Sequence, residues 1–183
     1  MGQYWKTVNL DKREFICPHK LGSGLKLWEQ VNNPPGTPVA LFILTASMPV
    51  QRGGGDLQPH PAIGRWAGDR IVTIGDYAED EDVPGSRIPA GILYTLCHSA
   101  EEIEDQRAHL RKLLRDPVHQ GGEAERQYRR QLRQLRGKQP FTDVSDMVCE
   151  VIEQECMGTF VGDGWRRWVP SQAVGVRHAA SAN

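Results

Sequence analysis

The N-terminal part of the chain alternates between apolar and polar positions in two short runs. Residues 4–8 read YWKTV and residues 13–16 read REFI, and both runs are rich in aromatic and β-branched side chains. The polar segment between them contains Asn9 and Asp11, residue types that favour tight turns. The pattern predicts a β-hairpin whose second strand ends before Pro18.

After this hairpin the apolar spacing becomes helical. Apolar side chains at positions 25, 28 and 31 predict a short helix, which the sequence NNPPG at 32–36 interrupts. The apolar run 39–48 favours a buried helix, with Thr37 as its N-cap and Pro38 at its first position. Because this run is short, a buried strand remains the alternative.

The middle of the chain contains the pattern of an interior strand and one ambiguous segment. Residues 69–76, DRIVTIGD, predict a strand. Residues 92–97, ILYTLC, predict either a strand or the start of a helix.

Two helices are predicted in the charged segment 99–139. Ser99 followed by Glu101 and Glu102 is typical of a helix N-terminus, and Asp116–Pro117 ends that helix. After Gly121–Gly122 a second helix is predicted over 123–136. Its narrow apolar stripe comprises Ala124, Tyr128, Leu132 and Leu135.

A third helix is predicted over 144–156, with Thr142 or Asp143 as its cap, followed by a short strand at 159–161. Residues 171–183 are small and polar and predict a flexible tail.

These elements indicate a single α+β domain over residues 1–170. We expect a small mixed or antiparallel sheet with helices on one face, and 99–139 as a protruding charged helical hairpin inserted into the domain.

Composition narrows the class of protein. The chain has 183 residues, of which 39% are hydrophobic and 25% charged, with a net charge of −1. This apolar content is typical of a folded chain, and no apolar run is long enough to cross a bilayer. The start of the chain has no secretory pattern, so we expect a cytoplasmic protein with reduced cysteines and no membrane association.

Charge is strongly segregated along the chain. Residues 76–105 carry a net charge of −8, residues 107–138 carry +7, and residues 141–163 carry −6. The basic block predicts contact with an acidic partner protein. Nucleic-acid binding through the helix at 123–138 and a plain solvated helix face are the alternatives. The candidate binding residues are Arg126, Arg129, Arg130, Arg133 and Arg136.

Four Gly-Asp pairs place carboxylates where a tight turn can present them to a metal or substrate. Asp56 with His60, followed by a strand that ends in Gly75–Asp76, resembles the calcineurin-like metallophosphoesterases. The resemblance implies metal-assisted cleavage of a phosphate ester, with Asp69 as a further candidate. Asp56 and His60 are four positions apart where that family has two, and no Asn-His pair follows.

The cysteines and tryptophans offer weaker candidates. Cys17 with His19 and Cys97 with His98 could supply four zinc ligands, but they lack the paired spacing of a structural zinc site, and metal binding stays open. We interpret Cys149 and Cys156 as core thiols. If the Gly-Asp loops converge, their neighbouring tryptophans form a binding rim; otherwise each pins its own loop to the core. These tryptophans are Trp66, Trp165 and Trp168.

Several segments together resemble a family of small uncharacterised proteins found as hypothetical open reading frames in microbial genomes. The segments are MGQYWKTVNLDKREF, PHKLGSGLKLWE and GRWAGDRIVTIGDY. The resemblance covers residues 1–82 and 141–165 and implies that they form one structural unit. It implies no activity.

The sequence therefore favours a protein-interaction or regulatory binding module without catalysis of its own and without a cofactor. We expect its partner to be another protein, with a second copy of the chain as an open alternative. A metal-dependent phosphoesterase that uses Asp56, His60, Asp69 and Asp76 is the competing enzyme hypothesis.

Overall fold

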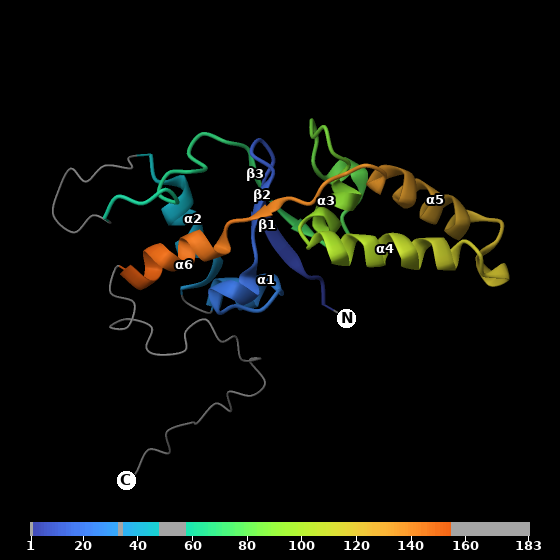
Figure 1. Ribbon diagram of the computed structural model, residues 1–183, viewed down its shortest axis with the longest axis horizontal. Coiled ribbons are helices and arrows are strands. Elements are labelled where there is room, and N and C mark those ends of the chain that lie inside the picture. Colours follow the sequence, from blue (N-terminus) through green and yellow to red (C-terminus); the bar gives the residue numbers. More distant parts are fainter. Residues whose placement is uncertain (1, 33–34, 48–57, 155–183) are drawn as a thin grey trace, which may run out of the picture.

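The computed structural model describes residues 2–32, 35–47 and 58–154 (Figure 1). These residues form six α-helices and a four-stranded mixed sheet, which confirms the α+β class. The strands are β1 (Trp5–Asn9), β2 (Glu14–Ile16), β3 (Ile71–Gly75) and β4 (Thr142–Asp143). The helices are α1 (Leu27–Asn32), α2 (Gly36–Thr45), α3 (Ala90–Leu96), α4 (Ala100–Leu113), α5 (Glu123–Leu135) and α6 (Ser145–Gln154). Three 3-10 helices, η1 (Pro18–Leu21), η2 (Asp80–Asp82) and η3 (Pro117–His119), lie between them.

The sheet has the strand order β3-β1-β2-β4. The predicted hairpin is confirmed: β1 and β2 are antiparallel, with Val8 opposite Phe15. Its turn is closed by the side chain of Asn9, whose carbonyl oxygen accepts hydrogen bonds from the backbone N–H groups of Asp11 at 3.0 Å and Lys12 at 2.9 Å. An asparagine at this position therefore determines where β1 ends.

Helices cover both faces of the sheet, where the sequence predicted one. In Figure 1, α1, α2 and α6 lie on one side of the sheet, and α3, α4 and α5 lie on the other. Val8, Phe15 and Ile74 pack in one core cluster with residues of α3, α4 and α5. Ile16 packs in the other core cluster, with residues of α2 and α6. The three residues of β2 are all buried, so both faces of this strand need cover.

The structure resolves the two ambiguous segments in favour of helices. Residues 92–97 belong mostly to α3, and the apolar run before residue 48 forms α2. Thr37 is not the cap of α2, because the helix begins at Gly36 and the Thr37 hydroxyl donates a hydrogen bond to Gln30 at 2.9 Å. Within residues 2–32, 35–47 and 58–154, no helix combines the length and apolarity needed to cross a membrane.

The charged hairpin is formed by α4 and α5 and extends away from the sheet (Figure 1). Ser99 caps α4 as predicted, since its hydroxyl accepts from the Glu102 backbone N–H at 3.1 Å and the Glu102 carboxylate accepts from the Ser99 N–H at 2.8 Å. Ile103 and Leu135 are buried near the base of this hairpin, and Leu110 is buried in the last turn of α4, nearer the tip. Apolar packing therefore extends along the inside of the hairpin.

The strand β4 was not predicted. Thr142 and Asp143 pair in parallel with Glu14 and Phe15, directly before α6. Asp143 then caps α6, because its carboxylate accepts a hydrogen bond from the Ser145 backbone N–H at 2.9 Å. The predicted strand at 159–161, the end of the third helix and the tail at 171–183 lie outside the described residues.

A buried lysine joins the sheet to α3. Lys6 on β1 is 5% exposed, and its Nζ atom donates to the backbone carbonyl of Cys97 at 2.5 Å. The ammonium group also lies 5.3 Å from the ring centroid of Phe15 and 5.0 Å from that of Tyr94. Burial lowers the pKa of Lys6. The side chain places a cation at the C-terminal end of α3, where the helix dipole is negative.

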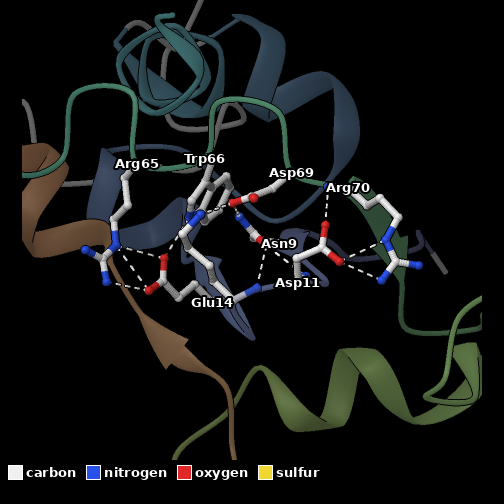
Figure 2. Close-up of polar contacts among 8 residues, drawn as sticks. Asn9, Asp11, Glu14, Arg65, Trp66, Asp69 and Arg70 are labelled. Atoms are coloured by element: carbon white, nitrogen blue, oxygen red, sulfur yellow. Dashed lines mark hydrogen bonds and ion pairs between the residues drawn. The ribbon is translucent and has the colours of Figure 1, made fainter.

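A buried carboxylate joins β2 to the segment between α2 and β3 (Figure 2). Glu14 accepts hydrogen bonds from the Arg65 guanidinium at 2.5 to 3.1 Å and from the Trp66 indole N–H at 2.8 Å. Trp66 is fully buried, so its N–H group depends on Glu14 for a partner.

Replacing Glu14→Ala is expected to lower the free energy of unfolding by about 3 to 5 kcal/mol, because it leaves Trp66 and the half-buried Arg65 without their acceptor. Urea unfolding followed by circular dichroism measures the loss. Asp11→Ala is the control, since it removes an exposed partner of Arg70 from the same region and should cost much less. Equal losses in the two variants would contradict the role of Glu14.

Candidate functional site

A cavity with a positively charged lining lies between α4 and α5. It is open to solvent and has a volume of about 490 Å³. Five arginines line it together with two leucines: Arg107, Arg111, Arg129, Arg133, Arg136, Leu114 and Leu132. Glu104 is the acidic residue in the lining.

Helical spacing brings these arginines together. Arg107 and Arg111 are four positions apart on α4, and Arg129 and Arg133 are four positions apart on α5, so each pair lies on one helix face. The two faces meet because α4 and α5 pack side by side in the hairpin (Figure 1). Arg136 follows the last residue of α5 and completes the cavity.

Arg107 is the fixed member of the group. One of its terminal nitrogens donates to the backbone carbonyls of Leu135 at 2.6 Å and Lys138 at 2.9 Å, and the other pairs with Glu104. These bonds cap the C-terminal end of α5, where carbonyl groups lack helical partners. The Nε atom of Arg107 is buried and has no hydrogen-bond partner among the described residues.

Three arginines of the cavity are unpaired. The side chains of Arg111, Arg133 and Arg136 form no hydrogen bond or ion pair with any residue in the described part of the chain, and all three residues are exposed. A guanidinium group keeps its charge throughout the physiological pH range and presents N–H donors in a planar fork. Together they create a site for an anion, best satisfied by carboxylate or phosphate oxygens.

The other predicted binding arginines are engaged within the hairpin or at its base. Arg126 pairs with Glu123 at 2.8 Å, and Arg129 pairs with Glu125 at 2.6 Å. The hydrogen bond from the Gly121 backbone N–H, assisted by Arg129, lowers the pKa of Glu125. Of the five arginines predicted from sequence, the structure therefore leaves Arg133 and Arg136 available.

Arg130 connects α5 to η2 instead of facing the cavity. Its guanidinium pairs with Asp80, whose carboxylate also accepts from the Gln134 side chain at 2.8 Å. Partial burial opposes the ionisation of Asp80, but the hydrogen bonds from Arg130 and Gln134 outweigh it and hold the pKa of the carboxyl below its ordinary value. This contact fixes the base of α5 against the acidic block of the chain.

The candidate phosphoesterase residues are not assembled into one site. Asp69 precedes β3 and Asp76 follows it, so they lie roughly 20 Å apart at opposite ends of that strand. Asp69 pairs with Lys12 and accepts from Asn9 at 2.7 Å (Figure 2). His60 lies 3.2 Å from a Glu150 oxygen on α6. Asp56 lies outside the described residues.

Asp76 has a structural contact of its own, since its carboxylate accepts from the Tyr4 backbone N–H at 3.0 Å. Within 2–32, 35–47 and 58–154, no three His, Cys, Asp or Glu side chains gather in a way that could hold a metal ion.

The cysteines described are free thiols, and burial raises the pKa of Cys97 to about 12. Cys156 is outside the described residues.

For Trp66 the structure confirms the alternative in which the tryptophan pins its own segment to the core, since its side chain is fully buried and bonded to Glu14 and does not form a binding rim. Trp165 and Trp168 lie outside the described residues.

Arg107 and Arg111, which form the α4 side of the cavity, were not predicted as binding residues from the sequence. Their four-residue spacing, repeated by Arg129 and Arg133 on the next helix, is the signal that could have found them.

Replacing Asp80→Asn is expected to lower the free energy of unfolding by about 1 to 2 kcal/mol at neutral pH, because Arg130 loses its charged partner. The lowered pKa means that the carboxylate stabilises the fold above its ordinary pKa, near pH 4, and that this contribution disappears as pH falls through the folded-state value. The gap between wild type and variant should therefore close in acid. Urea unfolding at a series of pH values measures it, and a gap independent of pH would contradict the assignment.

Comparisons with known proteins do not supply a function for this site. A scan against protein-family models, a search of curated proteins and a search of solved structures each find no match to the chain. The relationship to small microbial proteins suggested by the N-terminal segments stays a prediction. The role of the cavity is therefore argued from its own residues.

Proposed function

We propose that the protein is a binding module that recognises an acidic segment of a partner protein in the arginine-lined cavity between α4 and α5. The observation that carries the proposal is the convergence of Arg111, Arg133 and Arg136 without internal partners. Three like charges held close together repel one another, and an anionic ligand would relieve that repulsion. The hairpin that bears them projects from the sheet, so a partner can approach it (Figure 1).

The size and chemistry of the cavity suit a peptide that carries both carboxylates and an apolar side chain. Its volume of about 490 Å³ is in the range of ligand pockets, and Leu114 and Leu132 supply apolar surface beside the guanidinium groups. Carboxylates bind arginine through two parallel hydrogen bonds, which gives geometric selectivity as well as affinity. Arginine does not exchange protons near neutral pH, so this chemistry supports recognition rather than catalysis.

The surroundings of the cavity favour a protein over a nucleic acid. Carboxylates of Glu104, Glu123 and Glu125 lie on the same hairpin and would repel a continuous chain of phosphates. Tyr128, the aromatic residue of α5, packs edge-on against His119 at 5.6 Å and does not offer a stacking platform for bases. A short acidic peptide in the cavity need not extend over Glu123 and Glu125, and Glu104 is the acidic residue that it would meet.

The double variant Arg111→Glu with Arg133→Glu is expected to weaken binding of a fluorescent peptide of alternating Glu and Leu at least tenfold, because two attractive charges become repulsive. Fluorescence anisotropy at low ionic strength measures the affinity. The matched control is Arg115→Glu with Arg126→Glu, which makes the same change in net charge on the hairpin but outside the cavity lining. The control should bind nearly as well as wild type.

Equal loss of binding in the two double variants would contradict a specific cavity and indicate general electrostatic attraction. A single-stranded oligonucleotide is the second probe. If it binds in preference to the peptide, with affinity that falls steeply as salt is added, then the hairpin is a nucleic-acid site and the proposal is wrong.

A further inference from the structure

The strand β3 forms one edge of the sheet, and no strand of residues 2–32, 35–47 or 58–154 pairs with its outer side. In the strand order β3-β1-β2-β4, it pairs only with β1 among the described residues. Its sequence, IVTIG, has no charged residue and no proline, and Thr73 at its centre is exposed. Edges without lysine, proline or a covering element are templates for pairing with another strand.

The direction of each backbone group in β3 follows from its pairing with β1. The Arg70 carbonyl accepts from the Leu10 N–H at 3.0 Å, and the Asp76 N–H donates to the Tyr4 carbonyl at 3.0 Å. Because an antiparallel ladder alternates, even-numbered positions face β1 and odd-numbered positions face outward. The free edge therefore presents the backbone groups of Ile71, Thr73 and Gly75, although the Gly75 carbonyl already accepts from the Ala78 N–H.

We infer that two copies of this chain associate through antiparallel pairing of β3 with β3 about a two-fold axis at Thr73. In this register the two Thr73 residues exchange their N–H and carbonyl groups. Each Gly75 N–H then donates to the Ile71 carbonyl of the other copy. All of these groups are at the outward-facing positions, so the pairing leaves the ladder with β1 intact.

Charge complementarity favours a second copy over an unrelated strand. The same register places Arg70 of each copy opposite Asp76 of the other, at both ends of the paired segment. Both side chains have capacity left for this contact. Arg70 uses its Nε and one terminal nitrogen for Asp11, and Asp76 uses one carboxylate oxygen for the Tyr4 N–H. A strand that is complementary to itself is the signature of an isologous interface.

An exposed apolar groove lies beside this edge and adds surface to the interface. Thr7 and Thr73 form part of it, and Leu27, Val31, Leu41 and Phe42 from α1 and α2 supply apolar lining around about 370 Å³. Phe42 is 77% exposed and Val31 on α1 is 59% exposed. Pairing at Thr73 brings the grooves of the two copies to the same face of one continuous sheet, where aromatic side chains can be removed from water.

The decisive experiment places charges on the two-fold axis. Thr73→Lys and Thr73→Glu each bring two like charges directly opposite one another, so each variant alone is expected to be monomeric where wild type is dimeric. Mixing the two variants should restore a dimer that contains one copy of each. Sedimentation velocity and native mass spectrometry of the full chain measure mass and composition over a wide range of concentration.

Val118→Lys is the control, because it places the same charge at an exposed position on η3, far from β3 along the chain, and it should remain dimeric. Circular dichroism checks that each Thr73 variant is folded, and amide hydrogen exchange of wild type should show protection at Thr73. A monomeric wild type overturns the inference. It is overturned equally if both Thr73 variants remain dimeric alone, or if a mixture of folded variants does not form the mixed dimer.

Discussion

The buried carboxylate of Glu14 is the interaction on which the rest of the structure depends. It lies at the start of β2 and binds the side chains of Arg65 and Trp66, which belong to the segment between α2 and β3. The backbone of that segment is bonded in turn to the end of α2, since the Trp66 N–H donates to the Leu44 carbonyl at 2.7 Å. One acidic side chain thus connects the hairpin, the apolar helix α2 and the strand β3. Because Trp66 is fully buried, loss of the carboxylate would leave its indole N–H without an acceptor.

Local sequence signals predicted much of the fold. The β1–β2 hairpin follows from its residue types and from Asn9, whose side chain forms the turn. The limits of α4 and α5 follow from the capping box at Ser99 and from two glycines with positive φ, Gly121 and Gly122. In each of these places the physical cause lies within a few neighbouring residues, and a single sequence contains it.

Features that depend on contacts between distant residues were not predicted. The two residues of β4 carry no strand pattern of their own. They pair with β2 because they lie between α5 and α6, whose packing places them beside it. The partner of the Trp66 indole was not predicted, because Glu14 is far away from it in the sequence. Helices on both faces of the sheet were missed because β2 is too short for its two apolar faces to be recognised.

In the candidate site, too, local features were predicted from the sequence and contacts between distant residues were not. Basic residues on the hairpin were identified from sequence, and Arg133 and Arg136 do line the cavity. Arg129 also lines the cavity but is held by Glu125, and Arg130 is held by Asp80, an acidic residue from the preceding block of the chain. Segregated charge along a sequence therefore predicts which blocks attract one another, but only the fold shows which individual side chains remain free.

The parallel pairing of β2 with β4 has a consequence for the order in which the chain folds. The pairing of Glu14 with Thr142 cannot form until Thr142 has been synthesised, and the whole of the α4–α5 hairpin is synthesised before it. That hairpin contains mainly local contacts and can form quickly, whereas closing the loop to β4 is the slow, entropically costly step. During synthesis the outer edge of β2 is therefore uncovered until β4 emerges. A nascent chain of this protein exposes this part of its sheet while more than 120 residues are added.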